Sequence, residues 1–314
     1  MSLEGDLIDW LEKHLPGGSR IHVGLGDDGA VLQGFGNSQP VVTTDMLTDG
    51  VDFLLDAVEP QQVGHKALGV NLSDLAAMAA QPIAVFVSLV LPTAGSGRLS
   101  AFELATGIYL GMMPLAERLG VTIAGGDTNS WNGPLAISIT AVGESTEQGP
   151  LTRSGGQVGD QLVVSGQLGG SILGRHLQVE PRVEEALLLH QRYELHAGID
   201  ISDGLALDTA RLAKASSLGA VLDLSAVPLA DAAHRQSKQD GRSAIEHALG
   251  DGEDFELVLA VPDQAARQLL QEQPLEVELT RIGQLIEHPG LWQKNEQGEL
   301  NPLEPRGFQH GEDL

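Results

Sequence analysis

The sequence predicts an α/β protein (α/β or α+β) built from two domains. At about 150 residues per domain, the 314 residues correspond to two domains. In both halves, short apolar segments with strand character alternate with segments of helical periodicity. Between the halves, residues 143–149 are polar, contain two glycines and hold no apolar run. We therefore expect an N-terminal domain over residues 1–148 and a C-terminal α/β domain over residues 149–314.

The N-terminal half carries three helix signals. Leucines recur at helical spacing over residues 3–15, and a Pro-Gly-Gly sequence ends that helix. A second helix is expected over about residues 60–79. Ser100 and Glu103 have capping-box spacing at the start of a third helix, which Gly120 ends. Apolar runs predict strands at residues 21–24, 30–33, 41–44, 84–91, 121–124 and 135–142.

The C-terminal half repeats the alternation of strand and helix signals. Its expected strands are residues 161–165, 220–224 and 255–261. Its expected helices are residues 171–178, 183–196, 202–217 and 263–272.

The composition excludes several classes of function. Lys and Arg number 18 against 43 Asp and Glu, which gives a net charge of −25 and leaves few cations for a surface that binds nucleic acid or an anionic membrane. Cysteine is absent, which removes disulfides, thiolate metal sites and cysteine nucleophiles. The N-terminus has no signal-peptide pattern, and the longest apolar run is split at Gln81-Pro82. We expect a cytoplasmic protein without nucleic-acid or membrane partners.

The segment Gly24–Gly29, GLGDDG, fits the dinucleotide-binding spacing by its letters alone. Its variable positions hold Asp27 and Asp28, which would repel a pyrophosphate, and no helix pattern follows. Paired carboxylates on a glycine-flanked turn are suited instead to a hard cation such as Mg²⁺. An exposed acidic turn is the alternative interpretation.

Four further motifs place acids beside Gly, Ser or Thr near the ends of predicted elements. Single motifs have plainer explanations, since Ser202 or Asp203 could cap a helix and the other acids could form turns or face solvent. Their repetition at strand ends, where α/β proteins bind ligands, favours a phosphate site with several metal ions. The motifs are Thr43-Thr44-Asp45, Asn71 to Asp74, Gly125-Gly126-Asp127 and Asp200 to Gly204.

The sequence lacks the motifs that mark other phosphate-binding and hydrolytic enzymes. No Lys follows a Gly, so the chain has no Walker A loop. The protein-kinase motifs H-R-D and D-F-G, the G-x-S-x-G elbow and the H-E-x-x-H zinc motif are also missing.

Taken in order, the motifs resemble those of the thiamine-monophosphate kinase family, part of the aminoimidazole-ribonucleotide-synthetase-like ATP-binding superfamily. The resemblance covers almost the whole chain, and NLSDLAAM and DISDGL are its most specific strings. The matching strings are GLGDDGAVL (24–32), TTDML (43–47), HKALGVNLSDLAAM (65–78), GGDT (125–128), LTRSG (151–155), GIDISDGL (198–205) and GDGEDFEL (250–257).

The resemblance implies a mixed-sheet N-terminal domain that pairs across a homodimer, with the C-terminal domain packed beside it. It implies that ATP binds in the cleft through several Mg²⁺ ions. The implied metal ligands are Asp28, Thr43 (through its backbone oxygen), Thr44, Asp45, Asp74, Asp127, Asp200 and Asp203. The implied ATP contacts are Tyr109, Gly126, Asp127, Arg153 and Ser202, and the implied substrate contacts are Asp52, Glu253 and Phe308. Asp127, Arg153 and Asp203 are the implied catalytic residues.

The implied reaction is direct, in-line transfer of the ATP γ-phosphoryl group to thiamine monophosphate, giving thiamine diphosphate and ADP. Two anions must meet, so the barrier is mainly one of charge and position. Arg153 can stabilise phosphoryl oxygens, and the acids can hold cations that do the same. The nucleophile is an ionised phosphate oxygen, so no strong general base is needed.

One departure from the family pattern falls in GVDF, where Asp52 stands at a position that commonly holds His. A carboxylate there would attract the thiazolium cation of the substrate and repel its phosphate. The alternative is that Asp52 is a tolerated change at the rim of the binding site. Two rival functions follow from the same motifs. One is a sister ATP-dependent synthetase, which does not require GDGEDFEL or Phe308, and the other is a catalytically silent Mg-ATP-binding protein.

Overall fold

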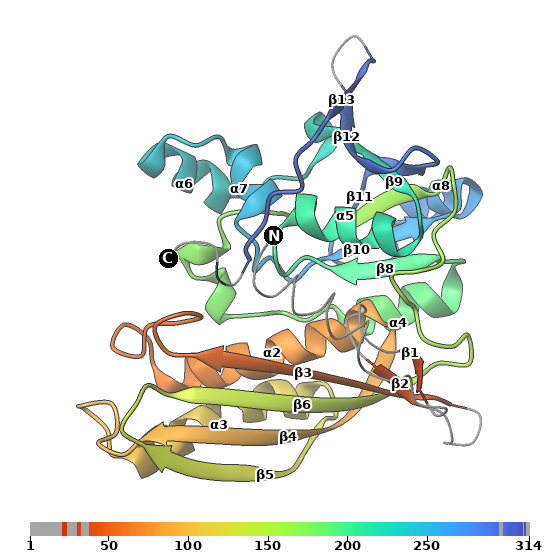
Figure 1. The fold of residues 1–314 in the computed structure, drawn as a ribbon. Helices are drawn as coiled ribbons and strands as arrows, with labels where there is room; N and C mark the ends of the chain where they lie inside the picture. Colours follow the sequence, from red (N-terminus) through yellow and green to blue (C-terminus); the bar gives the residue numbers. More distant parts are fainter. Residues whose placement is uncertain (1–20, 24–29, 33–37, 295–297, 310, 312–314) are drawn as a thin grey trace.

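A computed structural model describes residues 21–23, 30–32, 38–294, 298–309 and 311 of the chain. The helix expected over residues 3–15 and the pair Asp27 and Asp28 lie outside the described residues. Within them the fold is mixed α/β with two sheets, as the sequence predicts (Figure 1). No helix of this described part is long and apolar enough to span a bilayer.

The first sheet has its strands in the order β1-β2-β3-β6-β4-β5. Its neighbours are antiparallel except β4 and β5, which run parallel. Helices α2 (Pro60–Ala77) and α3 (Ala101–Arg118) both lie on one face of this sheet (Figure 1). The strands are β1 (Ile21–Val23), β2 (Ala30–Leu32), β3 (Pro40–Thr48), β4 (Ala80–Pro92), β5 (Thr122–Trp131) and β6 (Ala136–Ser145).

The two helices pack closely because glycines form their contact. A Cβ atom built at Gly64 would lie 1.9 Å from the carbonyl oxygen of Ile108, and one at Gly111 would lie 1.9 Å from that of Gln61. On its other side α2 meets the second domain, where His65 Nε2 lies 2.8 Å from the carbonyl oxygen of Val179. Helix α2 is therefore buried between the first sheet, α3 and the second domain.

The second sheet has its strands in the order β13-β12-β9-β11-β7-β10-β8. One apolar core runs from the first sheet through α2 to α4 and α8, and a second fills the space between this sheet, α5 and α7. The strands are β7 (Gln161–Ser165), β8 (Ala197–Asp200), β9 (Gly219–Leu222), β10 (Leu257–Val261), β11 (Leu279–Ile286), β12 (Gly290–Lys294) and β13 (Leu300–Pro302). The helices are α4 (Val183–Arg192), α5 (Leu205–Ala215), α6 (Asp231–Asp240), α7 (Ala244–Gly250) and α8 (Asp263–Glu272), with 3₁₀ turns η1 (Ser171–Leu173), η2 (Arg175–Leu177) and η3 (Leu224–Ala226).

Several expected elements are confirmed, among them α2, α8 and the Ser100–Glu103 capping box of α3. The helix expected over 171–178 is wrong, because Gly174, at φ +129°, separates two 3₁₀ turns. The helix expected over 183–196 ends at Arg192, and strand β8 follows it. The helix expected over 202–217 begins only at Leu205.

Two of the acidic motifs were expected at strand ends and instead lie inside strands. Thr43-Thr44-Asp45 falls within β3, and Gly125-Gly126-Asp127 falls within β5. The apolar runs mark only the first residues of these strands, whereas backbone pairing continues through the polar residues that follow. The first sheet ends at Ser145 and the second begins at Gln161, and a domain boundary at 148/149 remains our proposal.

We predict that Gly111→Ala lowers the free energy of unfolding by about 1–3 kcal/mol, because its methyl group must push α2 away from α3. Gly250→Ala is the control, since its new Cβ would have its nearest neighbour at 3.8 Å. Urea denaturation measures both variants. Equal stability of the two would contradict this account of the α2–α3 contact.

Candidate active site

Helix α2 gathers acidic side chains from both domains around residues 71–74. The hydroxyl of Thr43 donates to Asp74 Oδ2. The backbone N–H of Asp45 donates to Asn71 Oδ1 at 3.2 Å. Neighbouring Ser73 donates from its hydroxyl to Asp200 Oδ2 at 2.6 Å. These hydrogen bonds tie residues 71–74 of α2 to Thr43 and Asp45 of β3 and to Asp200 of β8.

The Ser73–Asp200 contact joins the two domains. Asp200 ends β8, an edge strand of the second sheet, and is only 2% exposed, while Ser73 is 1% exposed. A buried carboxylate needs hydrogen bonds to remain ionised. The serine hydroxyl from the first domain therefore helps to hold this second-domain acid in place.

A second group of charges surrounds Asp203 at the start of α5. Arg211 donates to the carboxylates of Asp203 and Asp208. Asp208 is 1% exposed and accepts the backbone N–H groups of Asp203 at 2.9 Å and Gly204 at 3.1 Å. Burial raises the pKa of Asp208 to about 7, and the charge of Asp203 adds to this, while Arg211 and Arg153 oppose it. Arg153 therefore lies within electrostatic reach of this group.

The GDGEDFE segment, residues 250–256, and the C-terminal tail pack against the same loop. The backbone N–H of Glu253 donates to the carbonyl of Ser202 at 2.7 Å. The backbone N–H of Phe308 donates to the carbonyl of Asp203 at 2.9 Å. The structure thus brings Ser202, Asp203, Glu253 and Phe308 together, as a shared binding site requires.

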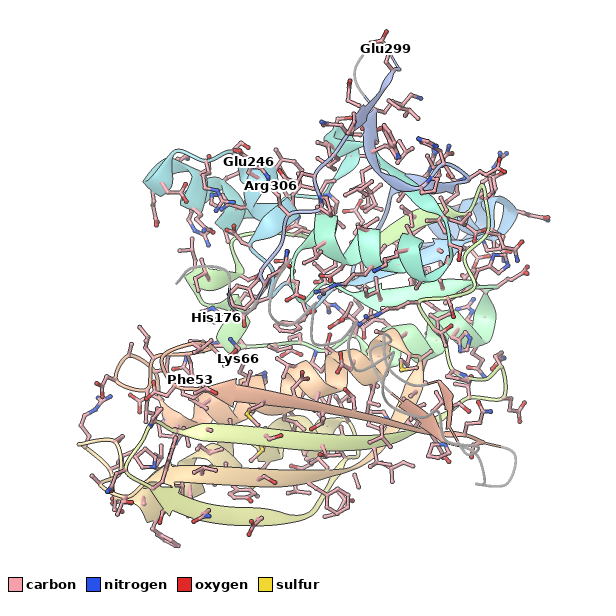
Figure 2. The ribbon with its side chains drawn as sticks, in the orientation of Figure 1. Phe53, Lys66, His176, Glu246, Glu299 and Arg306 are labelled. Carbon is pink, nitrogen blue, oxygen red and sulfur yellow. The ribbon has the colours of Figure 1, made fainter. Side chains whose placement is uncertain are left out.

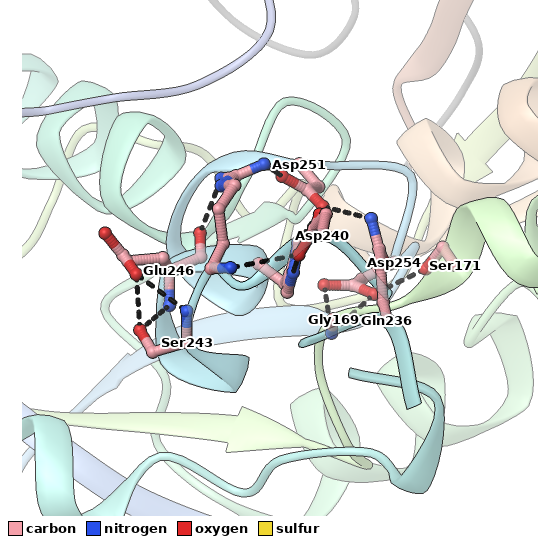
Figure 3. A network of polar contacts seen from close by, with 10 residues as sticks. Gly169, Ser171, Gln236, Asp240, Ser243, Glu246, Asp251 and Asp254 are labelled. Atoms are coloured by element: carbon pink, nitrogen blue, oxygen red, sulfur yellow. Dashed lines mark hydrogen bonds and ion pairs between the residues drawn. The ribbon is translucent and has the colours of Figure 1, made fainter. Parts of the chain in front are cut away.

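The acids on either side of Glu253 turn into the second domain (Figure 3). Asp251 accepts from Gln236 Nε2 at 3.0 Å and from Arg242 Nη1 at 2.8 Å. Asp254 is 5% exposed and accepts from the N–H of Gly169 at 3.0 Å and the hydroxyl of Ser171 at 2.5 Å. These contacts fix the backbone on both sides of Glu253.

Asp52 faces its own turn. Its Oδ2 accepts the backbone N–H of Thr48 at 2.6 Å. Its carbonyl oxygen accepts from Lys66 Nζ at 2.7 Å, and the same ammonium group lies 2.5 Å from Glu253 Oε1. Asp52 is therefore close to Glu253, with Lys66 between them.

Other residues expected at the site are not brought to this cluster within one chain. Thr44 points to the opposite face of β3 from Thr43 and bonds the carbonyl of Ile139 at 3.1 Å. Gly126 and Asp127 are exposed on β5, which β6 and β4 separate from β3. At about 4.8 Å per strand, Asp127 lies about 14 Å from β3. Tyr109 lies on α3 next to Ile108, whose carbonyl oxygen lies against Gly64 in the first turns of α2.

The donor set of the cluster fits Mg²⁺, because it consists of carboxylate, hydroxyl and amide oxygens. In the described part of the chain, no three acidic or histidine side chains are already arranged around a single metal position. Mg²⁺ usually takes one or two carboxylates together with water and substrate phosphates. The residues present therefore fit metal ions that bind together with a phosphate ligand.

Sequence reasoning missed Lys66, Asp208 and Arg211. Asp208 lies on the buried face of α5, and Lys66 interrupts the buried face of α2. A charged residue on an otherwise buried helical face was the available signal in each case.

Comparisons with known proteins agree with this organisation. Residues 26–145 match the family described as AIR synthase related protein, N-terminal domain, and residues 139–291 match the corresponding C-terminal domain. The thiamine-monophosphate kinase of Rhodopirellula baltica is 44% identical over 93% of this chain and 92% of its own length. That of Escherichia coli is 33% identical over 84% of this chain and 82% of its own length.

Solved structures give the same result. AaThiL complexed with AMPPCP and TMP has a TM-score of 0.83 at 29% identity and covers 98% of this chain and 97% of its own. Thiamine-monophosphate kinase from Stenotrophomonas maltophilia has a TM-score of 0.73 at 32% identity, over 94% of this chain and 96% of its own.

We predict a pH-dependent stability effect from Asp254. Burial raises its pKa to about 6 despite Arg175 and the bonds from Ser171 and Gly169, whereas an unfolded Asp titrates at about pH 4. Between pH 4 and pH 6 the folded state binds more protons at this group than the unfolded state does. Its contribution to the free energy of unfolding is therefore greatest below pH 4 and is lost as the pH rises through 6. Asp254→Asn does not titrate, so its stability relative to wild type should rise from pH 4 to pH 6 and then stay level. Urea denaturation across that range tests this, and a difference independent of pH would contradict it.

Proposed function

Because the chain belongs to the thiamine-monophosphate kinase family, we propose that it transfers the γ-phosphoryl group of ATP to thiamine monophosphate, giving thiamine diphosphate and ADP. The observation that carries the proposal is that α2 is hydrogen-bonded to acid-bearing segments of both domains, β3 in the first and Asp200 in the second. Family membership rests on thiamine-monophosphate kinases such as one that is 44% identical over 93% of this chain. The absence of cysteine suits the reducing cytoplasm, where we place the reaction.

The residues of the site provide position and charge rather than a strong base. When bound, Mg²⁺ would neutralise phosphate oxygens and so lower the repulsion between the two substrates. Asp45, Asp74 and Asp200 would hold the ions, and Asp203 would complete their coordination from the α5 side. Arg153 would bind phosphoryl oxygens, because a guanidinium group donates two parallel hydrogen bonds to them, and it lies within electrostatic reach of Asp208 and Arg211.

The loop of residues 250–256 and the tail provide the acceptor side of the proposal. Glu253 carries a negative charge suited to the cationic thiazolium ring, and the half-exposed ring of Phe308 offers an aromatic surface for it. Both adjoin Ser202 and Asp203. Thiamine monophosphate bound there would direct its phosphate toward the acids.

We further propose a homodimer formed through the first sheet. One face of this sheet carries no helix of its own and exposes apolar side chains, with Met46 66% and Phe86 44% exposed. Among the described residues, β5 pairs only with β4, and β3 beyond Val42 pairs only with β6. Such edges invite pairing. A partner's β5 placed along β3 would carry its Gly126 and Asp127 toward the acids that one chain alone keeps apart from them.

The test is purified protein with ATP, Mg²⁺ and thiamine monophosphate, with thiamine diphosphate and ADP followed by chromatography. We expect both products in equal amounts, and we expect removal of Mg²⁺ by a chelator to stop the reaction until Mg²⁺ is restored. ATP binding without any thiamine diphosphate would instead support the silent binding protein. Activity that is indifferent to the chelator would exclude the metal-dependent mechanism.

We predict that Asp203→Asn lowers turnover by about 100-fold or more, because it removes a charge that would act on the transferring group. The fold should survive, since Arg211 keeps Asp208 as a partner. Asp263→Asn on the exposed surface of α8 is the control and should retain full activity. Wild-type turnover in Asp203→Asn, measured in the same assay, would remove this residue from the mechanism.

A further inference from the structure

We propose that Lys66 is a positioning residue for recognition of the organic cation of the substrate, acting through Glu253. The inference rests on the proposed function and deepens it. In this proposal, a buried lysine of the first domain orients a substrate-binding carboxylate of the second domain. Figure 2 shows Lys66 at the junction of the two domains, between Phe53 and His176.

Burial determines which member of the pair can reach a ligand. The side chain of Lys66 is 0% exposed, whereas that of Glu253 is 32% exposed. Lys66 Nζ donates to Glu253 Oε1 at 2.5 Å and to the carbonyl oxygen of Asp52 at 2.7 Å. Lys66 thus cannot touch a bound substrate directly, and its influence must pass through Glu253.

The ion pair explains why a lysine stands on a buried helical face. An ammonium group removed from water is tolerated only when it is paired and hydrogen-bonded. The partner comes from 187 residues away in the sequence and from the other domain. The pair therefore ties α2 to the loop that also contacts Ser202.

The backbone of this loop is fixed independently of Lys66. Glu253 and Phe255 are held at φ +55° and +50°, a region that non-glycine residues seldom adopt. Contacts of Asp251 and Asp254 within the second domain hold the chain on either side (Figure 3). Strained backbone of this kind is concentrated at functional sites. With the backbone held in this way, the bond from Lys66 Nζ to Glu253 Oε1 sets the orientation of the carboxylate.

The pairing leaves part of the carboxylate available. Lys66 occupies Oε1, and within the described part of the chain Oε2 has no hydrogen-bond partner. A substrate cation would meet a carboxylate that is already oriented, so little conformational freedom is lost on binding. The contact concerns the thiamine portion of the substrate and not its phosphate.

The experiment compares wild type with Lys66→Met, Lys66→Arg, Glu253→Gln and the double variant Lys66→Met/Glu253→Gln. Calorimetry gives the Kd for thiamine monophosphate, for thiamine and for Mg-ATP, and steady-state kinetics give KM and kcat. We expect Lys66→Met to raise the Kd of thiamine monophosphate and of thiamine by the same factor, at least tenfold. The Kd of Mg-ATP should change less than twofold, and kcat at saturation should change less than KM.

Glu253→Gln should show the same pattern, and the double variant should bind no worse than the weaker single variant. Lys66→Arg, which keeps the charge, should recover part of the affinity. Equal losses for Mg-ATP and thiamine would reduce Lys66 to a structural role and overturn the proposal. A loss confined to thiamine monophosphate would also overturn it, because it would place Lys66 at the phosphate.

If Lys66→Met fails to fold, Lys66→Gln takes its place, since its amide can still donate to the carbonyl of Asp52. If neither Lys66 variant folds, the Kd of thiamine in Glu253→Gln tests the proposal by itself. A Kd equal to that of wild type would contradict it. Wild-type turnover is measured first. If wild type forms thiamine diphosphate and Lys66→Met binds thiamine normally, only this inference fails. If wild type neither binds nor converts thiamine monophosphate, the proposed function fails with it.

Discussion

The packing of α2 against the second domain fixes how the two domains meet, and the hydrogen bond from Ser73 to Asp200 connects the candidate site to that junction. Both residues are almost fully buried, and the 2.6 Å contact lies one residue from Asp74 on α2. Without this junction, Asp74 and Asp200 would belong to separate surfaces. With it, one helix presents Asn71, Ser73 and Asp74 to acids from two sheets.

Gathering acids creates repulsion, and the structure offsets it with individually placed cations. Arg211 bridges Asp203 and Asp208, and Lys66 holds Glu253. Elsewhere in the same loop, Arg182 binds Glu256 with two nitrogens, at 2.6 and 2.8 Å. A buried charge left without its partner is far more costly than the pair itself. These pairs position the acids, and the remaining negative charge is available for metal ions that bring in phosphates.

Much of the site could be predicted from the sequence because its chemistry is local. Ser202, Asp203 and Gly204 are neighbours in the chain, and the i, i+3 spacing of Asn71 and Asp74 places them on one face of a helix. Strands β3 and β5 were recognisable only by the apolar residues near their starts. The sequence therefore could not show that Asp45 lies inside β3 or that Asp127 lies inside β5.

Relationships between distant segments could not be read from the pattern. The strand order places β5, which carries Asp127, three positions from β3. The similar acidic motifs of the two strands give no sign of this separation. The helical pattern places Lys66 on a buried face, but it could not show that the partner is Glu253 of the second domain. Helix α6 escaped prediction because its polar composition leaves Ala233 as its one buried residue.

The central claim is that acids from both domains bind metal ions together with a nucleotide. Electron paramagnetic resonance of Mn²⁺, titrated with a non-hydrolysable ATP analogue, counts the ions held by each variant. Asp74→Asn in the first domain and Asp200→Asn in the second should each hold at least one ion fewer than wild type, while Asp263→Asn matches wild type. Full Mn²⁺ occupancy in both site variants would contradict the account.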